Sequence, residues 1–173
     1  GTYTIQAIIA ETEQYYGATC TKDFTILQRD ATVTALAQMI TYGDNIVTSP
    51  SASAMETYAT LTNGVSGHTI TALTLAKTQT EYSATAYNND ITPSSATIKD
   101  EQNNDVTANY NISYVNGDLT INQRAVTVTA KAQTITYGSN IVTNPEADMM
   151  DTYATLTNGV SGHAITALTL AKT

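Results

Sequence analysis

The two histidines are the residues of this chain best suited to nucleophilic or acid–base chemistry. His68 and His163 each end the sequence Gly-Val-Ser-Gly-His, so a serine lies two positions before each of them. A catalytic serine needs a histidine base that a carboxylate orients. The sequence has no G-x-S-x-G motif, the turn that exposes a nucleophilic serine in α/β-hydrolases. A histidine that starts a strand after a turn is therefore the favoured interpretation, and the sequence predicts no enzymatic activity.

The acidic residues predict loop charges and no catalytic pair. Acid–base work by carboxylates needs two of them in one cleft. The acids fall in predicted turns and are interpreted as solvated: Glu81, Asp90, Asp100, Glu101 and Asp105. The run 100–105 offers oxygen ligands that calcium prefers, but it lacks the ligand spacing and central glycine of an EF-hand loop. An acidic turn is favoured and calcium is the alternative, so no catalytic, cofactor or metal residue is assigned.

Three other residue types have a possible chemistry and an ordinary alternative. Cys20 has no partner thiol, and we expect it to pack on a strand as a small hydrophobe. Tyr82 and Tyr87 are the better candidates for stacking on a sugar ring, although sheet packing is favoured for both. Intramolecular Lys–Asn isopeptide crosslinks are a minor alternative. The lysines are Lys22, Lys77, Lys99, Lys131 and Lys172.

The composition favours strands to position these side chains. The 173 residues include 34 Thr, 13 Asn and 11 Tyr, whereas Trp is missing and Phe occurs once. Thr and Tyr suit a pleated strand surface. The formal charge of −8 would repel phosphate backbones and anionic headgroups. We therefore expect no nucleic-acid partner, and no segment is apolar for long enough to predict membrane insertion.

An internal repeat defines the expected domains. The segment Arg29–Thr78 recurs as Arg124–Thr173, 95 residues later and with most positions identical. The register extends upstream, where KDFTILQR matches GDLTINQR. We predict one complete repeat domain at 29–123, the last strands of a preceding Ig-like unit at 1–28, and the first half of the next repeat at 124–173. The half-unit at 124–173 is expected to be poorly ordered or completed by strands of residues 1–28, from the same chain or by exchange with another copy.

Alternation of period two predicts short strands separated by turns. Turn signals include Tyr42-Gly43-Asp44, Asn63-Gly64, Ser66-Gly67, Asn88-Asn89-Asp90 and Pro93-Ser94. Asn116-Gly117 predicts the clearest hairpin, because both residues tolerate positive φ. The fold class is all-β, with tandem Ig-like β-sandwich repeat domains. An α+β grasp-like unit, with a short helix near 50–57, is the alternative. The expected strands are 31–37, 39–42, 57–62, 68–76, 79–87, 95–99, 109–115 and 118–122.

The connection between repeats predicts a fixed rather than a flexible junction. The run DLTINQRAVTVTAKA from Asp118 to Ala132 contains neither glycine nor proline. Flexible linkers are rich in glycine and serine. We therefore expect the array to behave as a semi-rigid rod in which neighbouring repeats contact one another in sequence order.

The motifs of the unit resemble a known family of repeats. They are the Tyr-Gly turn at Tyr42-Gly43-Asp44, the Gly67-His68 pair, the NYNI run at 109–112 and the closing strand from Gly117 to Ile121. In this order they resemble the MBG or YDG domains, which are tandem repeats of bacterial cell-surface proteins. The opening residues GTYTIQAIIAETEQYYGATCTKDFTI are similar to the end of a bacterial Ig-like domain. The turn departs from Tyr-Asp-Gly, since it has Tyr-Gly-Asp or Tyr-Gly-Ser.

The resemblance implies an extracellular location on the bacterial surface or cell wall. It also implies a non-catalytic role as a semi-rigid stalk or spacer of an adhesin, without cofactors. The alternative is a weak, multivalent module that binds host glycans or mucin, with affinity gained through repetition. The resemblance assigns no binding residue.

Overall fold

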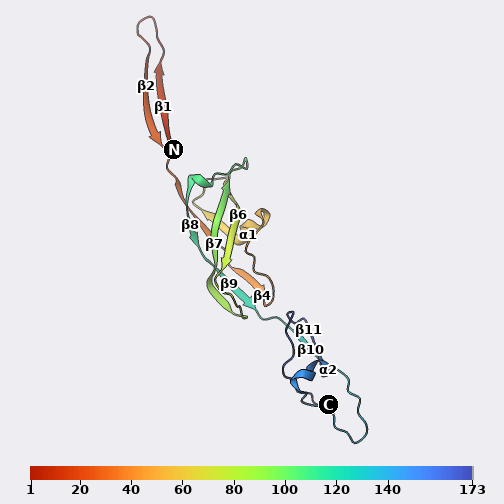
Figure 1. Cartoon of the computed structure of the whole chain (residues 1–173). Coiled ribbons are helices and arrows are strands. Elements are labelled where there is room, and N and C mark those ends of the chain that lie inside the picture. Colours follow the sequence, from red (N-terminus) through yellow and green to blue (C-terminus); the bar gives the residue numbers. More distant parts are fainter. Residues whose placement is uncertain (173) are drawn as a thin grey trace. The chain divides into compact units, whose positions relative to one another are not determined.

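The computed structural model describes residues 1–172 and confirms the all-β, sandwich-like class (Figure 1). It divides into two compact units, each interleaved along the chain. The first unit holds 1–37, 47–78 and 89–117; the second holds 38–46, 79–88 and 118–173. The contiguous repeat boundaries at 28/29 and 123/124 stay a prediction from the sequence. No helix within residues 1–172 has the length and apolar character needed to cross a membrane.

The first unit begins with a hairpin and continues with two layers of strands. β1 (Thr2–Ile9) pairs antiparallel with β2 (Ala18–Thr25). β3 (Arg29–Ala35) pairs antiparallel with β5 (Ala59–Thr62) and parallel with β8 (Tyr110–Val115). β6 (Thr69–Lys77) pairs antiparallel with β7 (Ala86–Lys99). Short helical turns complete the unit: η1 (Ala52–Ala54), α1 (Met55–Tyr58) and η2 (Thr107–Asn109).

The core of the first unit joins these two layers. Ala31 of β3, Ile98 of β7 and Tyr110 of β8 are buried together, with Leu61, Val106 and Ile112 packed against them. Val33 and Ile98 are fully buried, whereas Thr32 and Thr34 of β3 are only half-buried. This alternation is what a strand with one face on an apolar core produces.

The second unit contains two further strand pairs. β4 (Gln38–Thr41) pairs parallel with β9 (Gly117–Asn122). β10 (Thr127–Ala130) pairs antiparallel with β11 (Ala154–Thr157). The helical turns η3 (Ala147–Met149) and α2 (Met150–Tyr153) repeat η1 and α1, 95 residues later. The short helix considered near 50–57 therefore forms in both copies, within an all-β fold.

The predicted hairpin at Asn116-Gly117 is wrong. β8 pairs with β3 and β9 pairs with β4, so the two strands belong to different sheets. Neither residue has positive φ. A Cβ on Gly117 would lie 2.7 Å from the backbone oxygen of Ala35 and 2.8 Å from that of Leu36. Glycine is needed here for close approach of two backbone segments, which the dipeptide alone does not distinguish from a turn.

The predicted strand at 79–87 and the turns near Asn88 and Pro93 are also wrong. β7 is a single strand of 14 residues that starts at Ala86 and continues through Pro93. Asn89 and Ser95 adopt positive φ, at 55° and 53°. The pairing of β7 with β6 shifts register at two irregularities. Ser95 lies where β7 has an extra residue between the pairs Thr74–Ser94 and Ala72–Thr97, so a bulge accommodates it within the strand, and Pro93 pairs regularly with Leu75.

Asp90 is not a solvated loop charge. It lies in β7, is 2% exposed, and accepts a hydrogen bond from the hydroxyl of Thr78. The backbone N–H of Thr78 donates to the carbonyl of Asp90 at 3.2 Å. A buried carboxylate is retained where hydrogen bonds replace its water.

Candidate functional site at the Tyr42–Asp44 turn

The turn after β4 brings together a backbone carbonyl and a carboxylate. The N–H of Tyr42 donates to the carbonyl of Asn122 at 2.8 Å, which extends the pairing of β4 with β9. The N–H of Asp44 donates back to the carbonyl of Thr41 at 2.9 Å. Gly43 lies between them at φ 90°, in the left-handed region that favours glycine. The turn therefore leaves the Tyr42 carbonyl and the Asp44 side chain to other partners.

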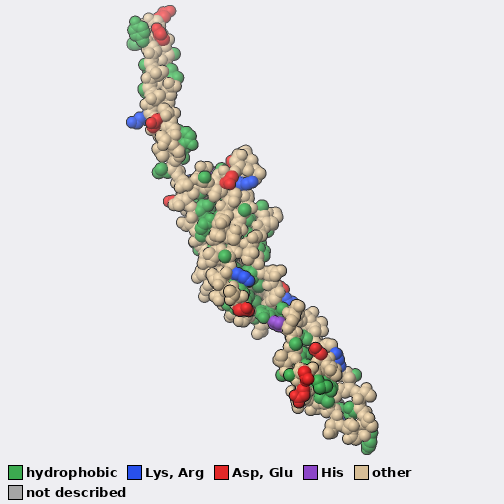
Figure 2. Space-filling view, in the orientation of Figure 1, with side chains coloured by type: hydrophobic (Ala, Val, Ile, Leu, Met, Phe, Trp, Pro, Cys, Tyr) green, Lys and Arg blue, Asp and Glu red, His purple; other side chains and the backbone are tan. Residues whose placement is uncertain are grey.

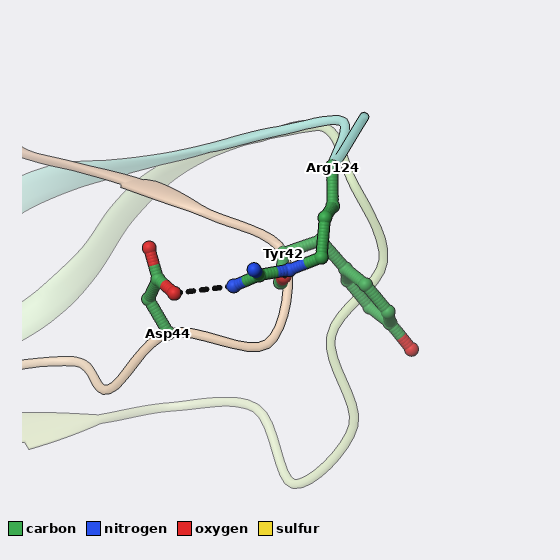
Figure 3. A network of polar contacts seen from close by, with 3 residues as sticks. All are labelled: Tyr42, Asp44 and Arg124. Carbon is green, nitrogen blue, oxygen red and sulfur yellow. Dashed lines mark hydrogen bonds and ion pairs between the residues drawn. The ribbon is translucent and has the colours of Figure 1, made fainter. Parts of the chain in front are cut away.

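Arg124 binds both the Tyr42 carbonyl and the Asp44 carboxylate (Figure 3). Its Nε donates to the carbonyl of Tyr42 at 2.6 Å, and its terminal nitrogen forms an ion pair with Asp44. The side chains of Arg124 and Asp44 are 28% and 51% exposed. The planar guanidinium supports both interactions at once, because its N–H groups are fixed in a fork. One side chain of the second repeat is thus bound to the turn of the first.

The same turn meets the loop after β11. A Cβ on Gly43 would overlap the side chain of Val160, so only glycine allows this approach. The ring of Tyr42 lies 5.7 Å from the ring of His163, at an interplanar angle of 46°. Arg124, Val160 and His163 thus contact the turn from one repeat copy, and the three residues are called the turn-binding surface below.

The equivalent residues of the first repeat have different partners. Nε of Arg29 donates to the carbonyl of Asn63 at 2.5 Å. Nδ1 of His68 hydrogen-bonds to the hydroxyl of Tyr110 at 2.7 Å, and their rings meet edge-on. The N–H of Val65 donates to the same hydroxyl at 2.9 Å. In the first repeat, the arginine, valine and histidine of this set therefore bind residues of their own repeat. In the second repeat, the equivalent three residues contact the Tyr42 turn of the first.

This arrangement gives His68 a structural role. Its Nδ1 hydrogen-bonds to a phenol, and the residue directly precedes β6 and follows a turn in which Gly67 has φ 80°. The phenol of Tyr110 is itself buried and also satisfies a backbone N–H. The predicted placement of this histidine, between a turn and a strand, is confirmed for this copy.

Tyr82, in the loop before β7, and Tyr87, near the start of β7, lie against each other. Their rings meet edge-on at 5.1 Å, and both are half-buried. The hydroxyl of Tyr87 accepts the N–H of Ser83 at 2.8 Å, and that of Tyr82 accepts the N–H of Gln79 at 3.3 Å. These contacts hold the loop 79–85. The structure therefore brings the two sugar-stacking candidates together and gives both hydroxyls local partners.

Cys20 does not pack as predicted. It lies in β2 opposite Ala7 and is exposed. Every residue of β1 and β2 is exposed, including Tyr3 and Phe24, whose rings stack at 5.6 Å. A two-stranded sheet buries little apolar surface by itself. Strand pattern alone could not show that, within residues 1–172, no second layer covers this hairpin.

Lys99 has an asparagine side chain as a hydrogen-bond partner. Its Nζ donates to Oδ1 of Asn103 at 3.0 Å, across an exposed turn. Amide bond formation needs a neutral amine, which burial favours and solvent exposure does not. This pair is therefore a turn contact in the structure.

The acidic loop after β7 satisfies its carboxylates with its own N–H groups. Asp100 accepts from Asn104, through the side chain at 3.0 Å and the backbone at 2.8 Å, and from the N–H of Gln102. These hydrogen bonds, the side-chain bond of Asn104 first, lower the pKa of Asp100. Hydrogen bonds from Thr107 likewise lower the pKa of Asp105. Within residues 1–172, no cluster of three His, Cys, Asp or Glu side chains could hold a metal ion.

An open groove of about 690 Å³ lies beside the turn-binding surface in the second unit. Its walls come from the turn, the loop before β7, β10 and the segment after β11. They include Tyr42, Tyr82, Val128, Leu156, Val160 and His163. Arg124 is the one Lys, Arg, Asp or Glu among the residues that line it. On the face of the molecule drawn in Figure 2, charged side chains form small, separate groups among uncharged ones. Apolar and aromatic side chains with a few polar groups therefore line this groove.

The importance of Arg124 was not predicted from the sequence. The available signal was that an arginine opens both copies of the repeat, at 29 and 124, directly after the closing strand of the preceding segment. Its partner could not be found in this way, because Asp44 lies 80 positions earlier and is replaced by Ser139 in the second copy.

Comparison of the chain with protein-family models, with curated proteins and with solved structures gives no match.

Proposed function

We propose that this chain is a non-catalytic segment of a bacterial cell-surface adhesin and acts as a semi-rigid stalk or spacer. The observation that carries the proposal is the binding of Arg124, from the second repeat, to the Tyr42 carbonyl and Asp44 of the first. The residues between β9 and β10 are few and include neither glycine nor proline. A short connection with a side-chain contact across it restricts the motion of successive repeats.

Two further features support a passive structural role. Threonine-rich strand faces and a net charge of −8 keep an extended array soluble. The ring of His68 hydrogen-bonds through Nδ1 to the buried phenol of Tyr110. The resemblance to MBG or YDG repeats supports a location outside the cell, on the surface or in the wall.

The proposal is tested by measuring how far from the cell surface the chain can present a ligand. Cells display a reporter ligand on this chain extended by zero, one or two further copies of residues 79–173, the 95-residue period. Capture by receptor-coated beads through a polysaccharide coat is expected to rise with copy number. Arrays of equal length with Arg124→Ala are expected to capture less, because a flexible chain spans less distance than a stiff one. Capture that does not depend on copy number would contradict a spacer.

The same proteins distinguish the spacer from the glycan-binding alternative. The full chain and its extended arrays are passed over immobilised mucin and a broad glycan panel. A spacer is expected to give no saturable binding in either format. Saturable binding that strengthens with copy number would instead establish the multivalent module.

A further inference from the structure

A second open groove lies in the first unit, between β5 and β6. Its volume is about 680 Å³, within the range of about 300–1,000 Å³ that is typical of ligand sites. Residues 59–61 of β5, residues 69–71 of β6 and parts of η1 and α1 line it. Successive residues of a strand face opposite sides of its sheet. A lining built from consecutive residues therefore follows the edges of the two strands, and the groove is called the edge groove below.

Both strands that border the edge groove are the outermost strands of their sheets. Within the described residues, β5 pairs with β3 alone and β6 pairs with β7 alone. All strands of these sheets lie within residues 29–122, one period of the repeat, so both edges belong to a whole repeat. The edge of β6 is partly covered, because the N–H of Leu75 donates to the carbonyl of Thr48 at 2.8 Å. The part at 69–71 lines the groove.

The pairing of β5 with β3 shows which backbone groups lie at the outer edge of β5. The N–H of Leu36 donates to the carbonyl of Tyr58 at 2.8 Å, so these two residues form a hydrogen-bonded pair. Bonded and non-bonded pairs alternate along antiparallel strands. The pair Thr34–Thr60 is therefore bonded as well. The N–H and the carbonyl of Leu61, between bonded pairs, point away from β3.

Ala59 supports this assignment. Its N–H also points away from β3, since it donates to the carbonyl of Met55 and caps α1. Within residues 1–172, the carbonyl of Ala59 and the N–H and carbonyl of Leu61 hydrogen-bond to no other group. An edge with unpaired backbone groups is a template for a further strand.

His68 lines the edge groove and offers a hydrogen-bond donor. The phenol of Tyr110 accepts the N–H of Val65 and is bonded to Nδ1 of His68. Within residues 1–172 the phenol has no other acceptor for its own hydrogen, so Nδ1 accepts it. The neutral imidazole therefore carries its proton on Nε2. Nε2 has no partner in that part of the chain, so its N–H is left for an occupant.

The remaining lining supplies one charge and an apolar floor. Glu56 is the one Lys, Arg, Asp or Glu among the lining residues, and within residues 1–172 it forms neither an ion pair nor a hydrogen bond. Met55 and Ile70 form the floor and are 3% and 7% exposed. An aliphatic side chain on this floor and a cation beside Glu56 would complement both features.

We infer that the edge groove binds an extended peptide in which a lysine or arginine lies beside aliphatic residues, and that this peptide adds as a strand to the outer edge of β5. Its backbone pairs with the carbonyl of Ala59 and with Leu61, and its basic side chain reaches Glu56. Another copy of this chain is the less suitable occupant, because each copy has a formal charge of −8. The inference goes beyond the spacer role and does not depend on it, since neither edge contributes to the junction between repeats.

Amide hydrogen exchange of the full chain tests the inference at single residues. The probe is the capped peptide acetyl-Thr-Val-Lys-Val-Thr-amide. At saturation it is expected to slow exchange of the Leu61 amide about 10-fold, because that N–H gains a partner. The Thr60 amide is the internal control, since it already bonds to β3 and should change little. No protection of Leu61 at about 5 mM peptide would overturn the inference.

Two matched peptides separate strand addition from simple contact. The same peptide methylated on every backbone nitrogen has no N–H to give to the edge, and it is expected to bind about 10-fold more weakly. Acetyl-Thr-Val-Glu-Val-Thr-amide keeps the backbone but reverses the charge, and it is also expected to bind more weakly. Equal binding of the methylated peptide would exclude strand addition. Equal binding of the glutamate peptide would exclude a basic partner.

Glu56→Gln tests the charge from the side of the protein. This variant is expected to bind the lysine peptide about 3-fold more weakly and with less dependence on salt, as expected for an exposed ion pair. Glu13→Gln is the control, because Glu13 is an exposed acid of the hairpin β1–β2 and should not affect binding. Equal loss in both variants would overturn the role of Glu56. Protection of Leu61 that rises with protein concentration alone would assign the groove to a second copy and overturn the inference.

Discussion

At the residue scale, a tyrosine hydroxyl organises the most connected part of the first repeat. The phenol of Tyr110 is bonded to Nδ1 of His68 and to the N–H of Val65, and the residue is 5% exposed. These contacts join β8 to the loop before β6. A hydroxyl that hydrogen-bonds to two polar groups at a buried position contributes more to stability than its own size suggests, because its loss leaves both groups without a partner.

Tyr110→Phe is therefore expected to lower the free energy of unfolding by about 1–3 kcal/mol, the cost of leaving buried polar groups unsatisfied. Urea denaturation measures the change. Tyr137→Phe is the control, since that ring is fully exposed and its substitution should leave stability unchanged. If the two variants were equally stable, the hydroxyl of Tyr110 would not contribute to the fold.

The loop that follows β7 is expected to loosen in acid. The pKa values of Asp100 and Asp105 are lowered by hydrogen bonds from Asn104 and Thr107. A lowered pKa in the folded state means that the stabilisation is complete above the unfolded pKa, near 4, and is lost as the pH falls through the lower folded pKa. Carboxylate ¹³C titration should therefore show both midpoints below ordinary aspartate values. In Asp100→Asn, the acid-induced change at the Asn104 amide should disappear; its persistence would exclude Asp100 as the cause.

At the element scale, alternation predicted which strands exist better than which strands pair. Val33 and Ile98 follow the expected inward face of their strands and are fully buried. Pairing depended on contacts between distant segments, such as Gly117 against the backbone of Ala35, which the local sequence does not encode. Asp90 was misplaced for the same reason, because its partner Thr78 belongs to another segment. The Tyr-Gly turn was predicted, but its binding of Arg124 was not.

Gly117→Ala should be among the most destabilising small substitutions in the chain. The added methyl meets two backbone carbonyl oxygens, which cannot rotate away, so the cost should reach about 2–4 kcal/mol in the free energy of unfolding. Gly64→Ala is the matched comparison, because its methyl meets the end of the flexible Leu61 side chain. Thermal unfolding of both variants measures the difference. Similar melting temperatures would show that the backbone approach at Gly117 is not tight.

Gly43 and Gly138 allow the strain of the turn to be separated from its docking. Both are in the left-handed region, at φ 90° and 88°, but only a methyl at Gly43 would overlap Val160, while that at Gly138 meets nothing within 4 Å. Alanine at either position should cost about 1 kcal/mol from backbone strain. Only Gly43→Ala should also change the ring signals of His163 and the Nε signal of Arg124. Equal effects of the two variants on these signals would contradict docking of the turn.

At the scale of the whole molecule, the residue after the turn glycine sets how firmly one repeat holds the next. Asp44 provides the ion pair to Arg124, and Ser139 stands at the equivalent position of the second turn. A half-exposed ion pair contributes about 0–1 kcal/mol and weakens with salt, whereas the bond to the Tyr42 carbonyl remains. Asp44→Ser should therefore loosen the junction modestly and remove its salt dependence.

Spin labels measure this loosening in a Cys20→Ser chain with cysteines at Met39 and Met149, two exposed side chains from different repeats. Asp44→Ser should broaden the distance distribution, and Arg124→Ala should broaden it further because both bonds are lost. Ser139→Asp should leave the distribution unchanged, since a methyl at the neighbouring Gly138 meets nothing within 4 Å, so no described side chain packs against this turn. A distribution that is equally wide in all four chains would mean that stiffness comes from the connecting backbone, and the turn would then be a contact without mechanical consequence.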